Sequence, residues 1–71
     1  QSVEFILDSL RRGILAREDM SPAVRNLALL FAVARLEQLG APFLNDQSTM
    51  HEIMPSFIER CFRTVSARKW P

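Results

Sequence analysis

The sequence has little of what usually reinforces a small protein: one Cys and one His among 71 residues. A single Cys excludes an intramolecular disulfide, and one Cys with one His argues against an internal zinc site. We therefore expect neither a metal nor a cofactor. An unpaired thiol is typical of a reducing compartment, so the sequence predicts an intracellular protein, either cytoplasmic or nuclear.

A large charge of one sign is also absent, because nine Lys and Arg face eight Asp and Glu and leave a net charge of +1. A protein that holds a polyanion mainly by its electric field carries a larger positive excess, so nucleic acid is not the favoured partner. The longest apolar run, residues 27–34, is less than half of the roughly 20 residues that span a bilayer. We expect no membrane partner.

Glycine is scarce, with two residues in the chain, whereas apolar side chains make up 48% of it and recur with helical spacing. The first predicted helix covers about residues 3–16, with Ser2 as its cap and Gly13 weakening or ending it. Asp8 and Arg12 on its polar face are spaced for an i, i+4 ion pair. Its apolar stripe consists of Val3, Ile6, Leu7, Leu10 and Ile14.

The second predicted helix, residues 22–39, has the clearest start and stop signals. Ser21 can cap its first N–H groups, Pro22 fits the first helical position, and Gly40 supplies the residue that commonly closes a helix. Residues 27–34 make this helix apolar on every face. Two short neighbours can hardly cover such a helix, so the pattern indicates a contact with a partner.

The third predicted helix covers about residues 50–68. Thr49 and Glu52 match a capping box at its start, and Pro55 predicts a kink or a restart of the helix. Together the patterns predict an all-α fold, a small three-helix bundle that can also dimerise. Because the chain begins at Gln1 and carries no leader, we expect residues 1–71 to be a single helical domain excised from a larger protein.

Catalytic chemistry has few candidate residues. His51 and Cys61 are ten positions apart, about 15 Å along one helix, so they cannot form a nucleophile and base pair. We expect Cys61 to be a buried thiol, His51 a surface residue, and Glu18 and Asp19 solvated loop residues. No phosphate-binding loop, dinucleotide fingerprint or paired metal-ligand spacing occurs. The sequence therefore predicts a protein that is not an enzyme.

The apolar excess favours a protein–protein interaction or dimerisation module of a larger protein, bound to another protein or to a second copy of itself. Arg, Trp, Phe and Met are typical of contact centres. Phe5 is a candidate because it lies about 200° around the first helix from Val3, on the polar face. The predicted partner-binding residues are Phe5, Leu29, Phe31, Val33, Met50, Met54 and Trp70.

Two alternatives stay open. One is a nucleic-acid-contacting accessory module that uses the basic end of the third helix beside Trp70, although the same basic residues also fit a solvated helix face that Glu59, four residues before Arg63, partly neutralises. Its predicted contact residues are Arg60, Arg63, Arg68 and Lys69. The other alternative is a segment of a helical-repeat scaffold.

Overall fold

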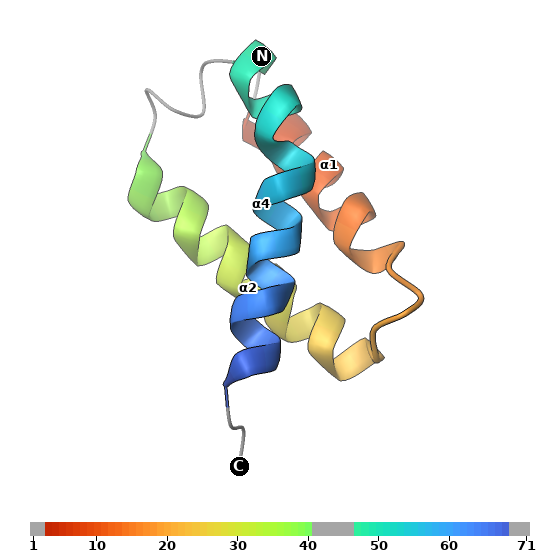
Figure 1. The fold of residues 1–71 in the computed structure, drawn as a ribbon. Coiled ribbons are helices and arrows are strands. Elements are labelled where there is room, and N and C mark those ends of the chain that lie inside the picture. Colours follow the sequence, from red (N-terminus) through yellow and green to blue (C-terminus); the bar gives the residue numbers. More distant parts are fainter. Residues whose placement is uncertain (1–2, 41–46, 69–71) are drawn as a thin grey trace.

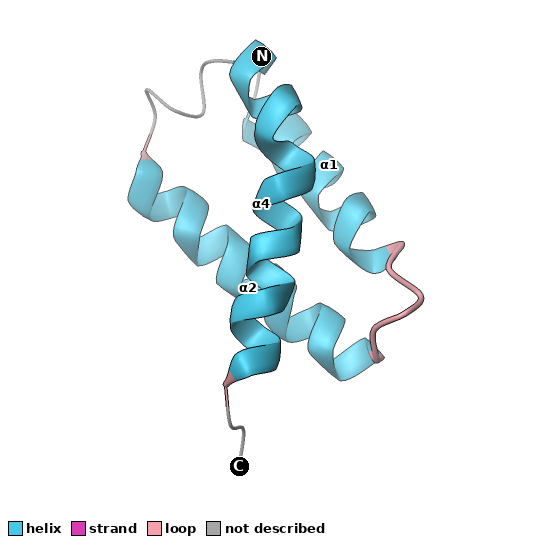
Figure 2. Cartoon of the chain, viewed as in Figure 1, coloured by secondary structure: helices cyan, strands magenta, loops and turns pink. Residues whose placement is uncertain are grey.

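The computed structural model describes residues 3–40 and 47–68. It contains α1 (Val3–Leu15), α2 (Pro22–Leu39) and α4 (Gln47–Ala67), and the described residues form no strand (Figure 1, Figure 2). In Figure 1, α4 crosses in front of α2, and α1 lies to its right. Each helix packs against the other two. The predicted all-α three-helix bundle is confirmed.

The ends of α2 follow the predicted local signals. The Ser21 side chain accepts a hydrogen bond from the Val24 N–H at 3.2 Å, and Pro22 occupies the first turn. Gly40 has a φ of 81°, in the left-handed region that glycine tolerates, and its N–H donates to the Leu36 carbonyl. Both predicted boundaries of this helix are therefore confirmed. The predicted cap of the first helix, Ser2, lies outside the described residues.

The start of α4 differs from the prediction. The helix begins at Gln47, so Thr49 already lies inside it and the proposed capping box with Glu52 is wrong. Pro55 also lies within one continuous helix, which rules out a restart at that position. Proline removes one helical hydrogen bond, but Pro55 is exposed, and the carbonyl left without a partner can be hydrated. Packing of the apolar face of α4, before and after Pro55, stabilises the helix by more than the lost hydrogen bond costs.

The core lies where one face of each helix meets the other two. The predicted stripe of α1 is buried at Ile6, Leu10 and Ile14, while α2 buries small residues and one leucine. The core residues from α2 and α4 are Ala28, Ala32, Leu36, Met50, Ile58, Cys61, Phe62 and Val65.

Gly13 lies inside α1 and marks a close approach to α4. A Cβ added there would lie 2.6 Å from Cδ1 of Ile58, closer than real Cβ contacts. The prediction that Gly13 weakens or ends the helix missed this role. The absence of a side chain lets α1 and α4 pack closely at this level of the bundle.

Candidate functional site

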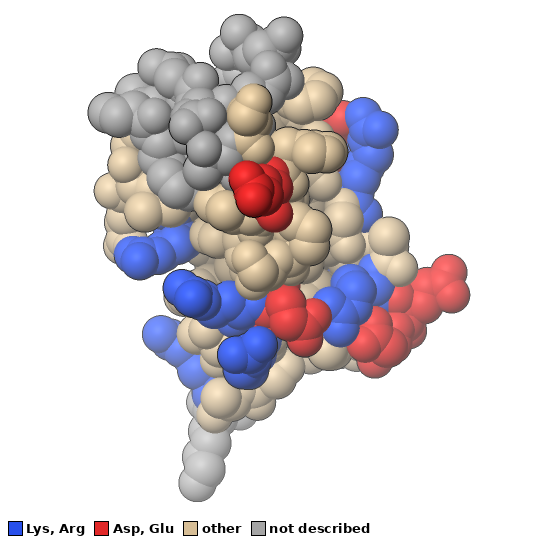
Figure 3. All heavy atoms as spheres, turned by 45° about the horizontal axis from the view of Figure 1, so that its top comes forward, with Lys and Arg blue, Asp and Glu red and all other residues tan. Residues whose placement is uncertain are grey.

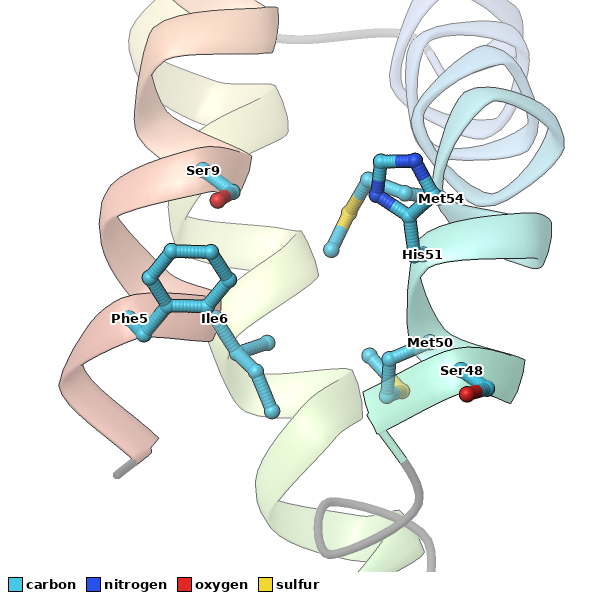
Figure 4. A pocket seen from close by; sticks show the side chains of 7 residues that line it. All are labelled: Phe5, Ile6, Ser9, Ser48, Met50, His51 and Met54. Carbon is cyan, nitrogen blue, oxygen red and sulfur yellow. The ribbon is translucent and has the colours of Figure 1, made fainter. Parts of the chain in front are cut away.

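A groove with a volume of about 400 Å³ lies between α1 and the first half of α4. We call it the α1–α4 groove. Phe5 and Ser9 line it from α1, and His51 and Met54 line it from α4 (Figure 4). The complete lining consists of Phe5, Ile6, Ser9, Ser48, Met50, His51 and Met54.

The lining residues lie at different depths because they occupy different faces of their helices. Ile6 belongs to the buried stripe of α1, and Met50 is 2% exposed, so these two side chains close the bottom of the groove. Phe5 is 50% exposed, since it lies one residue before that stripe. His51 is also exposed, while Met54 is half-buried. The groove therefore has an apolar floor and an exposed aromatic ring at its rim.

The sequence analysis found part of this site. Phe5, Met50 and Met54 were predicted to bind a partner, and the structure brings these three residues together around one groove. His51 was predicted to be a plain surface residue, and Ser9 was not singled out. The spacing of His51 and Met54, three residues apart on one helix, places both on one face. Their position opposite Ser9 depends on the packing of α4 against α1, which helical periodicity does not specify.

The apolar circumference of α2 is covered more fully than we expected. The predicted partner-binding residues Leu29, Phe31 and Val33 are half-buried and pack against the core. Leu30, which the sequence analysis did not single out, is 68% exposed. A helix that is apolar on every face has no polar side to indicate its orientation, so no sequence signal identified Leu30. Trp70 lies outside the described residues.

Arg17 forms ion pairs where the turn after α1 meets α4. Its guanidinium forms ion pairs of 2.9 Å with Asp19 and with Glu59 of α4. These bonds hold the pKa of Arg17 above its usual range, and the hydrogen bonds from Arg17 lower the pKa of Asp19. Glu18 and Asp19 are exposed, as predicted, but Asp19 is paired rather than only solvated.

The pairing of Glu59 corrects one prediction about the basic end of α4. Glu59 binds Arg17, and within the described residues it forms no ion pair with Arg63. Arg60, Arg63 and Arg68 are exposed. Figure 3 shows Arg side chains gathered toward the lower left of the face it draws. The predicted residues Lys69 and Trp70 lie outside the described part of the chain.

On α1, the predicted i, i+4 ion pair between Asp8 and Arg12 is confirmed.

The reactive side chains of the described residues offer limited chemistry. Cys61 is buried, as predicted, and burial raises the pKa of its thiol and so disfavours the nucleophilic thiolate. In residues 3–40 and 47–68, no group of three or more His, Cys, Asp and Glu could hold a metal ion. None of the helices in these ranges combines the length and apolar character needed to cross a bilayer.

Comparison of the chain with protein-family models, with curated proteins and with solved structures finds no match.

Proposed function

We propose that this chain is a non-catalytic protein-binding module of a larger protein, which receives apolar side chains of a partner protein in the α1–α4 groove. The observation that carries the proposal is the half-exposed ring of Phe5 at the rim of an apolar groove. Aromatic residues contribute large contact area and are enriched among the residues that dominate binding energy. The exposed ring and the groove beside it would bury apolar surface together when a partner docks.

The lining indicates the chemistry of the partner. No Asp, Glu, Lys or Arg is among the described lining residues, so an uncharged apolar surface fits the groove best. Ser9, Ser48 and His51 add hydrogen-bonding groups at its edges. Met50 and Met54 are unbranched and polarisable, and such side chains adapt to irregular apolar groups. An amphipathic helix of the partner, with apolar anchors one turn apart, matches this combination.

A second copy of the chain is a less favoured occupant than a different protein. Among the described residues, Leu30 is the most exposed of the large apolar side chains, and it lies on α2, outside the α1–α4 groove. Insertion of Leu30 into the groove of another copy would be a head-to-tail contact, which gives open chains unless its rotation closes a ring.

The buried thiol of Cys61 supports an intracellular location, cytoplasmic or nuclear.

The experiment selects helical peptides from a displayed random library on the domain and compares their affinities for two variants. Phe5→Ala removes the exposed ring at the groove, and Leu30→Ala is the matched control because Leu30 is also exposed but does not line the groove. Among the selected peptides we expect an uncharged, apolar family whose affinity falls by about tenfold or more in Phe5→Ala and is unchanged in Leu30→Ala. Equal effects of the two substitutions, or no effect of Phe5→Ala, would contradict the proposal.

Sedimentation at low micromolar concentration distinguishes the two possible occupants. A particle of 8.1 kDa supports a different protein as the partner. A dimer that Phe5→Ala converts to a monomer would assign the groove to a second copy and overturn our choice of occupant.

A further inference from the structure

A second hollow surface lies on the other side of α4, where α2 packs against it. Two adjacent hollows, with volumes of about 240 and 230 Å³, share Ile53, Phe57 and Arg60 of α4. We call them together the α2–α4 groove. The rest of the lining consists of Phe31, Arg35, Leu39, Ser56 and Cys61.

The charge at this groove is positive and locally uncompensated. Arg35 stands on α2 and Arg60 on α4, so an arginine lines the first hollow from each helix. Arg35 donates a hydrogen bond to the Gln38 side chain, and neither arginine forms an ion pair with a described residue. No carboxylate is among the described lining residues of either hollow.

Neighbouring residues add to the excess of positive charge at this groove. Arg63 is exposed one helical turn after Arg60, and the carboxylate nearest to both in sequence, Glu59, is held by Arg17 at 2.9 Å. Glu52 is exposed one turn before Ser56 but lines neither hollow. The end of the α2–α4 groove near Arg60 and Arg63 therefore carries two guanidinium groups without a carboxylate partner among the described residues.

We propose that the α2–α4 groove binds an acidic amphipathic segment of a partner protein. The apolar side chains of this segment pack against Ile53 and Phe57, and the carboxylates of the segment accept hydrogen bonds from Arg35 and Arg60. The guanidinium group is planar and forms paired hydrogen bonds with carboxylates, which makes arginine suited to this recognition. The surface is separate from the α1–α4 groove, because the two share no described lining residue.

The apolar lining favours a peptide over a nucleic acid. Phe31, Leu39, Ile53 and Phe57 line the first hollow, and a phosphate backbone would leave these side chains without apolar partners. The net charge of +1 also gives the chain little long-range attraction for a polyanion. An acidic amphipathic segment matches both the apolar lining and the two arginines.

The test selects helical peptides from a random displayed library on the unchanged domain and on Arg35→Ala/Arg60→Ala. Arg11→Ala/Arg12→Ala is the matched control, because it removes the same charge from exposed positions of α1 that line neither groove. All four arginines are exposed, so each variant should fold. The strongest peptide is then compared with its Glu-to-Gln and Asp-to-Asn counterpart.

We expect a peptide family that alternates acidic and apolar residues with helical spacing. Its affinity should fall about tenfold or more in Arg35→Ala/Arg60→Ala and in the neutralised peptide, but stay unchanged in Arg11→Ala/Arg12→Ala and in Phe5→Ala. Selection of no acidic family, or equal losses in the control, would overturn the proposal. A single-stranded oligonucleotide that binds more tightly than the peptides, loses affinity steeply between about 50 and 200 mM salt, and depends on Arg60 would assign the surface to nucleic acid instead.

Discussion

The Arg17 guanidinium lies over the ring of Phe62, with its Cζ 4.7 Å from the ring centroid. The same group binds Asp19 in the turn after α1 and Glu59 on α4. One side chain therefore joins a surface ion-pair network to a fully buried aromatic residue of the core. By holding Glu59, it also keeps that carboxylate away from Arg60 and Arg63, which form no ion pair with a described residue.

Asp19 provides a pH test of this network. Its folded-state pKa is lowered below the ordinary value of 3.8, mainly by hydrogen bonds from Arg17. A lowered folded pKa means that the contribution to stability is present above the unfolded value and is lost as the pH falls through the folded pKa. We predict a carboxyl NMR titration midpoint below 3.8 for Asp19 and a midpoint near the ordinary value in Arg17→Ala. Equal midpoints in both proteins would contradict the network.

Gly13 and Ile58 should be energetically coupled. Gly13→Ala gains about 1 kcal/mol of helix propensity, but its methyl group meets Cδ1 of Ile58 at 2.6 Å. Ile58→Val removes that carbon, at a cost of about 0.5 to 1.5 kcal/mol by itself. We predict that Gly13→Ala is more favourable in the Ile58→Val background, by at least about 0.5 kcal/mol, in a denaturation double-mutant cycle. Additive free energies would show that α1 and α4 do not approach closely there.

Cys61 should react with thiol reagents only when the bundle opens. The residue is 2% exposed, and burial raises the pKa of its thiol. The reactive thiolate is therefore scarce and inaccessible in the folded chain. We predict slow labelling by a disulfide reagent at pH 8 and rapid labelling once urea unfolds the domain. Equally fast labelling under both conditions would contradict the burial of this side chain.

Local signals in the sequence were sufficient to predict α1 and α2. Ser21, Pro22 and Gly40 act on the backbone next to them, and the stripe through Ile6 and Leu10 has a helical period that needs no knowledge of the neighbours. Pro55 was harder to interpret, because the free-energy cost of the helical hydrogen bond that it removes is offset by the packing of residues before and after it. That packing depends on α1 and α2, which a local pattern does not include.

The candidate sites were predictable only in part, for the same reason. Met50 and Met54 were identified by their chemistry, yet their meeting with Phe5 depends on how α4 lies against α1. Glu59 was assigned to Arg63, four residues later on the same helix, but Arg17 in the turn after α1 binds it. Sequence spacing predicts contacts within a helix and gives no information on which helix supplies a competing partner.

The most direct test of the proposed function uses the methyl groups of the three methionines in the chain. Met50 and Met54 line the α1–α4 groove, whereas Met20 packs against the core and is absent from its described lining, so Met20 is an internal control. Carbon-13 methyl NMR is recorded while the tightest peptide of the uncharged family, the one that Phe5→Ala weakens, is added. We predict that the signals of Met50 and Met54 shift and that of Met20 does not. A shift of Met20 alone, equal shifts of all three, or no shift during saturable binding would contradict a partner site in this groove.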